Sequence, residues 1–110
     1  MLKYNFYKNE IGTPQFGISG ELQGLSELGS CNENYLEEIV SSLENVLNGK
    51  LEQYDFGFEV YSIECKKDIS EVVDTYDGWQ SKAQIRTQEI YELMRDWKIY
   101  LENHKNERPI

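Results

Sequence analysis

The sequence predicts an α+β fold in which two helices pack on one face of a four-stranded, mostly antiparallel sheet, in the order ββαββα. Short segments with alternating apolar and polar residues indicate strands, and two longer stretches with apolar residues at helical spacing indicate amphipathic helices. No internal repeat, low-complexity stretch or Pro/Gly-rich linker divides the 110 residues. We therefore expect a single domain over residues 1–110.

The chain opens with an expected β-hairpin. Leu2, Tyr4 and Phe6 alternate with polar residues, which places them on one face of a strand. The segment 9–14 contains Gly12 and Pro14 and is typical of a turn. Residues 15–23 then begin with the same alternation, so we expect the two segments to pair antiparallel.

The first helix follows a glycine-rich loop. Ser30, Asn32 or Asn34 can cap its N-terminus, and Gly49 is placed to end it. Its apolar face consists of Leu36, Ile39, Val40, Leu43, Val46 and Leu47. The opposite face of this helix is acidic.

We expect residues 54–65 to form one strand in which the apolar alternation changes phase between Val60 and Tyr61. Either both faces of this strand are covered or a bulge lies between these two residues. A polar turn leads to a partner strand over residues 69–76, which ends at an Asp-Gly pair.

Residues 80–86 are polar, and we expect no regular structure there. Thr87 then caps the second helix, and Glu89 lies in its first turn, where negative charge is favourable. The buried face of this helix consists of Ile90, Leu93, Met94, Trp97, Tyr100 and Leu101.

The net charge of −9 is concentrated in the middle of the chain. Residues 21–64 carry ten acidic side chains against Lys50 alone, whereas residues 86–110 carry five acids and five bases. This distribution predicts a negative surface and argues against direct nucleic-acid binding, which needs a basic footprint. The alternative is that the acidity only keeps a small protein in solution.

We expect a cytoplasmic protein without a membrane partner. No apolar run is long enough to cross a membrane, and the N-terminus has no signal-peptide core. We expect Cys31 and Cys65 to be reduced thiols rather than a disulfide.

Enzyme signatures are mostly absent. His104 is the only histidine, and the two cysteines are far apart in the sequence, so a transition-metal site is not expected. Ser19 lacks the glycine spacing of a nucleophile elbow. We expect no catalytic residue, no metal and no cofactor. An enzyme based on carboxylates or a small-ligand domain remains an alternative.

Acidic and aromatic residues occur together in the predicted second hairpin, a combination suited to binding a basic protein. Flat aromatic rings supply the desolvated centre of a contact, and surrounding carboxylates accelerate association. The alternatives are that the aromatic rings pack in the core and that the acids of the first helix are merely solvated. The predicted partner-binding residues are Asp55, Glu59, Glu64, Asp74, Tyr76, Asp77 and Trp79, together with Glu37 and Glu44 of the first helix.

The segment from Arg86 to Leu101 resembles the C-terminal helix of several immunity protein families of bacterial polymorphic toxin and contact-dependent growth inhibition systems. In those families a Thr or Ser opens a helix that runs to Leu-x-x-x-Trp-x-x-Tyr/Phe, as Thr87, Leu93, Trp97 and Tyr100 do here. The resemblance covers about the last quarter of the chain and implies one-to-one capture of a toxin domain.

The resemblance also gives the acidic surface a role. Because nuclease toxins are commonly basic, an acidic surface could cover the toxin's active-site cleft. We therefore expect an immunity protein whose partner is a cognate toxin domain, and not an enzyme. An acidic DNA mimic that inhibits a nucleic-acid enzyme is the alternative binding function.

Overall fold

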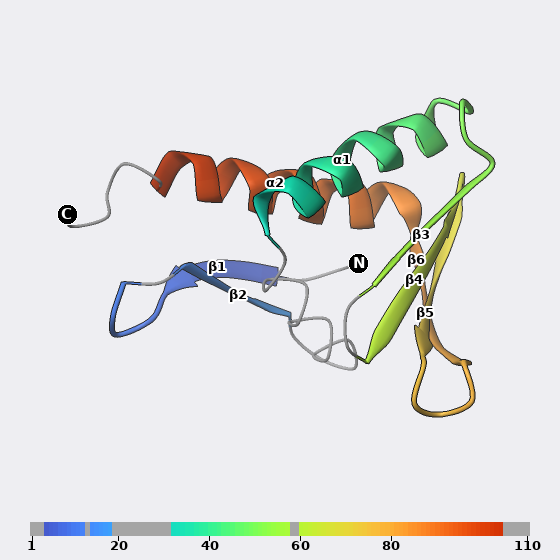
Figure 1. Cartoon of the computed structure of the whole chain (residues 1–110), viewed down its shortest axis with the longest axis horizontal. Coiled ribbons are helices and arrows are strands. Elements are labelled where there is room, and N and C mark those ends of the chain that lie inside the picture. The colour runs from blue at the N-terminus through green and yellow to red at the C-terminus, as the bar shows by residue number, and fades with distance from the viewer. Residues whose placement is uncertain (1–3, 13, 19–31, 58–59, 105–110) are drawn as a thin grey trace.

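The computed structural model describes residues 4–12, 14–18, 32–57 and 60–104. Within these residues the elements follow the order ββαββββα, and the described strands belong to a small sheet that contains β1 and β2 and to a four-stranded sheet (Figure 1). The elements are β1 (Tyr4–Lys8), β2 (Pro14–Ile18), α1 (Glu33–Leu47), β3 (Gln53–Gly57), β4 (Tyr61–Lys66), β5 (Ile69–Asp74), β6 (Gln80–Arg86) and α2 (Thr87–His104).

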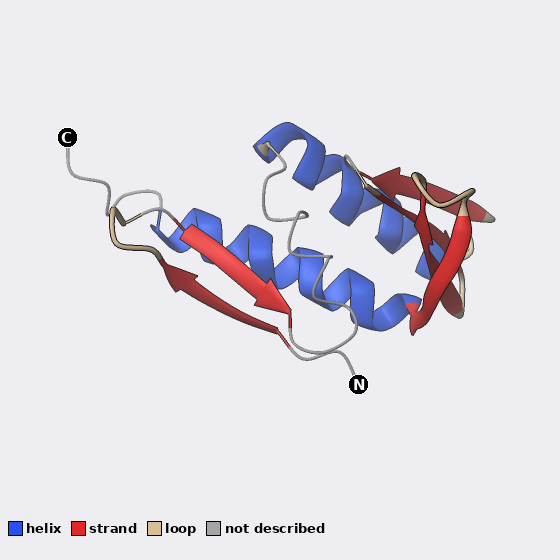
Figure 2. Cartoon of the chain, turned by 90° about the horizontal axis from the view of Figure 1, so that it is seen from below, coloured by secondary structure: helices blue, strands red, loops and turns tan. Residues whose placement is uncertain are grey.

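The expected N-terminal hairpin is confirmed, but it does not join the large sheet. β1 and β2 pair antiparallel in a second, smaller sheet, with Phe6 opposite Phe16. This hairpin lies along the C-terminal half of α2 (Figure 2), where the Phe6 ring contacts the rings of Trp97 and Tyr100. Ile18 is buried in the same core.

The predicted four-stranded antiparallel sheet is present, but its strands come from one continuous stretch of chain, in the order β3-β4-β5-β6. The described elements therefore do not confirm the ββαββα order. The change of phase at Val60 and Tyr61 marks a chain reversal between two strands, and not a bulge in one strand. Gly57 permits this reversal, because a Cβ atom there would lie 2.5 Å from the Tyr61 carbonyl oxygen.

The segment 80–86, for which no regular structure was expected, is the edge strand β6. Its polar composition follows from its position, because only Ala83 and Ile85 point toward the core. A bulge obscures the alternation further: Val72 pairs with Ala83 but Val73 pairs with Ser81, which leaves Lys82 as the extra residue.

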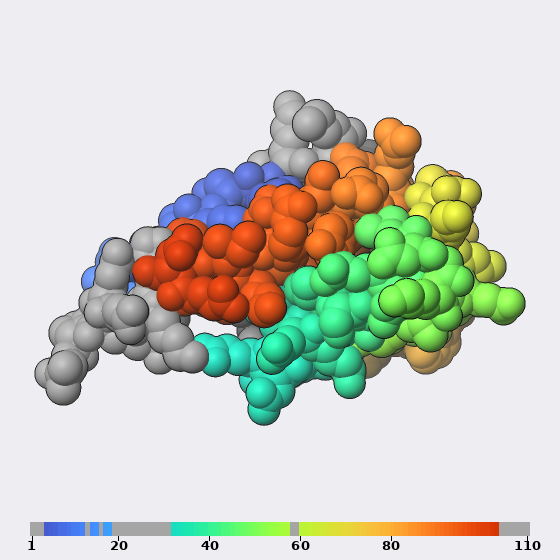
Figure 3. All heavy atoms as spheres, turned by 90° about the horizontal axis from the view of Figure 1, so that it is seen from above, coloured from blue at the N-terminus to red at the C-terminus, as the bar shows by residue number. Residues whose placement is uncertain are grey.

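Both helices cover one face of the four-stranded sheet, as expected (Figures 1 and 2). They run in opposite directions and lie side by side, as the teal-to-green and orange-to-red segments of Figure 3 show. The core between the helices and the sheet contains Leu36, Ile39, Leu43, Phe56, Ile63, Val72, Ile85, Ile90, Leu93, Met94 and Trp97.

The helix boundaries have local causes. Among the three predicted capping residues, Asn32 is the one that caps α1: its side-chain oxygen accepts a hydrogen bond from the Tyr35 N–H at 2.7 Å. Gly49, with φ of +82°, follows the end of α1. Thr87 is buried as the first residue of α2, and its hydroxyl donates to the Lys66 carbonyl oxygen.

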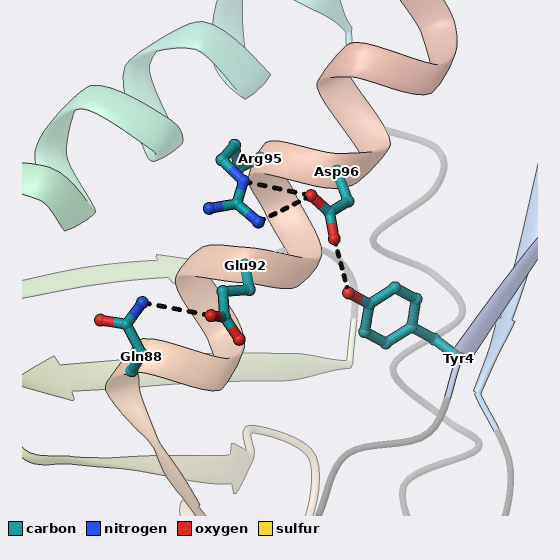
Figure 4. A network of polar contacts seen from close by, with 5 residues as sticks. All are labelled: Tyr4, Gln88, Glu92, Arg95 and Asp96. Atoms are coloured by element: carbon teal, nitrogen blue, oxygen red, sulfur yellow. Dashed lines mark hydrogen bonds and ion pairs between the residues drawn. The ribbon is translucent and has the colours of Figure 1, made fainter.

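A polar network ties α2 to the N-terminal hairpin (Figure 4). The Tyr4 hydroxyl donates to Oδ2 of Asp96 at 2.8 Å, and Arg95 donates twice to the other oxygen of that carboxylate. Burial and the hydrogen bond to Asp96 raise the pKa of Tyr4 to about 12. The small sheet is thus held to α2 by both apolar and polar contacts.

Candidate acidic interface

Three carboxylates lie in line across the outer face of the four-stranded sheet, the face opposite the helices. Asp55 on β3 pairs with Glu64 on β4, and Glu64 pairs with Glu71 on β5. Their neighbours Phe56, Ile63 and Val72 point into the core, so alternation directs the three acids outward. We call Asp55, Glu64 and Glu71 the acidic row.

The acidic row is not neutralised within the described part of the chain. Gln53 donates to Asp55 at 2.8 Å and Gln84 donates to Glu71 at 3.1 Å, but both partners are uncharged amides. None of the three acids forms an ion pair with a described Lys or Arg side chain. Like charges directly opposite each other on a sheet are destabilising, so this arrangement opposes folding.

A shallow hollow of about 320 Å³ lies beside the acidic row, lined by Glu64, Lys66, Ile69, Glu71 and Gln84. Ile69 is 43% exposed there, so the hollow offers an apolar side chain two residues before Glu71 on β5. Lys66 is the one cation among the residues that line the hollow. The outer face therefore combines a negative line with a small apolar area.

The turn between β5 and β6 carries the two predicted aromatic anchors. We call residues 75–79 the β5–β6 tip. Tyr76 is 75% exposed and Trp79 is 61% exposed, so neither ring packs in the core. Asp74 accepts a hydrogen bond from the Tyr76 N–H at 2.9 Å, which shapes the start of the turn. The alternative of core packing at the strand end is thereby excluded for both rings.

The backbone at the tip is unusual. The Gln80 N–H donates to the Asp77 carbonyl oxygen at 3.2 Å, and the two residues between them, Gly78 and Trp79, have φ of +63° and +60°. Two central residues with positive φ are the feature of a type I′ turn, which favours Asn and Gly. A bulky tryptophan in this conformation is a rare outlier.

The charges at the tip are partly balanced. Nζ of Lys82 lies 2.6 Å from Oδ2 of Asp77. The hydrogen bond to Asp77 raises the pKa of Lys82. Asp74 forms no ion pair with a described residue, so the tip with its flanking residues keeps one uncompensated carboxylate.

The remaining predicted site residues do not extend this surface. Glu37 and Glu44 are exposed on α1, which lies on the opposite side of the sheet from the acidic row (Figure 1). Glu59 falls outside the described residues. Glu71 was missed by the sequence reasoning, although alternation along β5 would have directed it outward beside Glu64 once β4 and β5 were placed in register.

The described residues offer little for metal binding or nucleophilic catalysis. Among the described residues, no group of three or more His, Cys, Asp or Glu side chains is placed to bind a metal ion. Cys65 is a buried free thiol whose pKa is raised to about 12 by burial, so it is not a nucleophile at neutral pH. Cys31 lies outside the described residues. No described helix is long and apolar enough to cross a membrane.

Comparison with protein-family models, with curated proteins and with solved structures finds no match to this chain.

Proposed function

We propose that this protein is an immunity protein that binds a basic bacterial toxin domain, of the nuclease class, and covers its active-site cleft with the outer face of the four-stranded sheet. The observation that supports this proposal most is the acidic row. Three carboxylates are aligned on the sheet and form no ion pair with a described Lys or Arg side chain, so a cationic protein surface would supply the missing charges.

The geometry of the row suits a cationic cleft. Neighbouring strands lie about 4.8 Å apart, so three aligned acids form a line about 10 Å long across the sheet. A cleft that binds the phosphates of a nucleic acid presents Arg and Lys side chains over similar lengths. A coherent negative surface also accelerates encounter with a cationic partner, by about 10- to 1000-fold at low salt.

The β5–β6 tip supplies the second component of such an interface. The tip follows directly on β5, the strand that bears Glu71, although alternation places Asp74 on the helix-facing side of the sheet with Val72. Exposed Tyr76 and Trp79 can become desolvated on binding, and each such aromatic anchor contributes about 2–4 kcal/mol when it is central to an interface. The acids would then steer the encounter, and the rings would prolong the bound state.

Bacterial growth tests this proposal. A basic nuclease toxin domain, selected from the genes that neighbour this one, is expressed with wild-type protein or with a Glu64→Lys/Glu71→Lys variant. We expect wild-type protein to protect the cells and the variant to fail. A Glu37→Lys/Glu44→Lys variant is the matched control, because it changes the net charge equally on α1 and should still protect.

Two results would count against the proposal. If wild-type protein neither protects nor forms a complex with that toxin domain, the protein does not neutralise it. If the Glu37→Lys/Glu44→Lys variant loses protection while the Glu64→Lys/Glu71→Lys variant keeps it, the binding surface is on the helices. Circular dichroism of both variants separates loss of binding from loss of folding.

A further inference from the structure

We infer that the β5–β6 tip binds an arginine side chain of the partner protein, with the guanidinium stacked on an exposed ring and hydrogen-bonded to the flanking carboxylates. This inference deepens the proposed function, because it names the group that the tip recognises. It is carried by the exposure of Tyr76 and Trp79, the conformation of Trp79 and the free carboxylate oxygens beside them.

Folding does not account for the tryptophan at this position. Trp79 has φ of +60° and a side chain that is 61% exposed, so it takes a strained backbone conformation without burying its ring. Glycine or asparagine would form the same turn at lower cost. Residues held in unfavourable backbone conformations are concentrated at binding sites.

Asp74 and Asp77, which flank the two rings in the sequence, each have one carboxylate oxygen that accepts no hydrogen bond from a described residue. Asp77 contacts Lys82 through Oδ2, and Asp74 accepts the Tyr76 N–H through Oδ1. In the described part of the chain, Oδ1 of Asp77 and Oδ2 of Asp74 have no hydrogen-bond partner. Within residues 74–82 the chain thus carries two acceptor oxygens, a net negative charge and two exposed rings.

This combination fits a guanidinium better than an ammonium group. The guanidinium is planar and weakly hydrated, stacks on aromatic faces and carries five N–H donors in a fixed fork. An ammonium is compact and strongly hydrated, and Lys82 already provides one beside Asp77. The tip projects from the body of the molecule, away from the helices (Figure 1), which suits entry into a concave cationic site.

Calorimetric titration of the full chain with hexa-arginine and with hexa-lysine tests the inference at near-physiological salt. We expect hexa-arginine to bind about tenfold more tightly than hexa-lysine, because only the guanidinium both stacks and bonds to the carboxylates. Trp79→Gly should abolish this preference. Since glycine adopts positive φ freely, this variant should keep or raise the melting temperature.

Two further variants sharpen the test. Asp74→Asn keeps the acceptor for the Tyr76 N–H and removes one charge, so it should weaken hexa-arginine binding by about threefold or more. Tyr7→Ala removes an exposed aromatic ring from β1 and should leave binding unchanged.

The inference is overturned if hexa-arginine does not bind, if both peptides bind equally, or if Trp79→Gly leaves the preference intact. Equal binding would mean that charge attraction alone operates. The proposed function fails separately: it falls if the wild-type protein gives no protection against the toxin domain, whatever the peptides do. If the peptide preference is absent but the Glu64→Lys/Glu71→Lys variant still loses protection, only the arginine inference is wrong.

Discussion

Gly57 shows how one residue can decide the path of the chain. Its N–H donates to the Tyr35 hydroxyl at 3.1 Å, and its carbonyl oxygen accepts from that hydroxyl at 3.2 Å. A Cβ atom at this position would meet the Tyr61 carbonyl oxygen at 2.5 Å and Ser62 Cα at 2.9 Å. Backbone atoms cannot move aside without distorting the β3–β4 pairing.

We therefore expect Gly57→Ala to lower the free energy of unfolding by about 2 kcal/mol, the usual cost of forcing a group into a packed site. Urea unfolding measures the effect. Gly17→Ala on β2 is the matched control: its Cβ atom would approach only side-chain atoms, the nearest at 3.3 Å. An equal loss in both variants would mean that the contact with Tyr61 is not the cause.

Tyr4 predicts a pH dependence of stability. Its pKa is raised from about 10 to about 12, first by burial and then by the hydrogen bond to Asp96, so the folded state keeps the phenol proton longer than the unfolded state does. The stabilisation is complete below about pH 10 and is lost as the pH rises through about 12.

The Tyr4→Phe variant isolates this contribution. We expect it to be about 1 kcal/mol less stable than wild type at pH 7, because the charge-assisted hydrogen bond is missing. The difference should shrink between pH 10 and pH 12 as the wild-type phenol ionises. Urea unfolding across this range measures it, and a difference that grows with pH would contradict the assignment.

At the scale of elements, the two helices and β5, expected over residues 69–76, were predictable, whereas the division of residues 54–65 into β3 and β4 and the edge strand β6 were not. In each helix the apolar spacing repeats over several turns, so several residues independently indicate the same helix. A hairpin strand of five or six residues gives only two or three apolar positions. The single change in the phase of the apolar alternation at Val60 was therefore compatible with a bulge in one strand as well as with a turn between two strands. Edge strand β6 had too few core residues to be recognised.

The acidic row makes a prediction about the sheet alone. Because Glu64 lies between two other acids, Glu64→Gln removes both repulsive pairs while keeping the shape of the side chain. We expect this variant to be about 0.5 kcal/mol more stable than wild type at low salt, and the gain to fall as salt is added.

The control for this prediction is Glu37→Gln, which removes one charge from α1 and should give no comparable gain. Thermal unfolding at two salt concentrations distinguishes the variants. If Glu64→Gln is no more stable than Glu37→Gln at low salt, the three acids do not repel one another measurably.

At the scale of the whole molecule, the charge distribution along the sequence predicted a negative surface but not its location. The acids of residues 21–64 are divided by the fold: Asp55 and Glu64 lie on the outer sheet face, whereas Glu37 and Glu44 lie on α1. Glu71 joins the acidic row from outside that segment. Sequence position could not show this, because the grouping depends on strand register, which long-range pairing determines.

The central claim is tested most directly by the affinity and association rate for the toxin domain of the proposed function. Both are measured across a range of salt concentrations for wild-type protein and for the two charge-reversal pairs. We expect Glu64→Lys/Glu71→Lys to slow association at least tenfold and to flatten its salt dependence, and Glu37→Lys/Glu44→Lys to have a much smaller effect. Equal effects of the two pairs, or no effect of the first, would contradict the assignment of the acidic row as the docking surface.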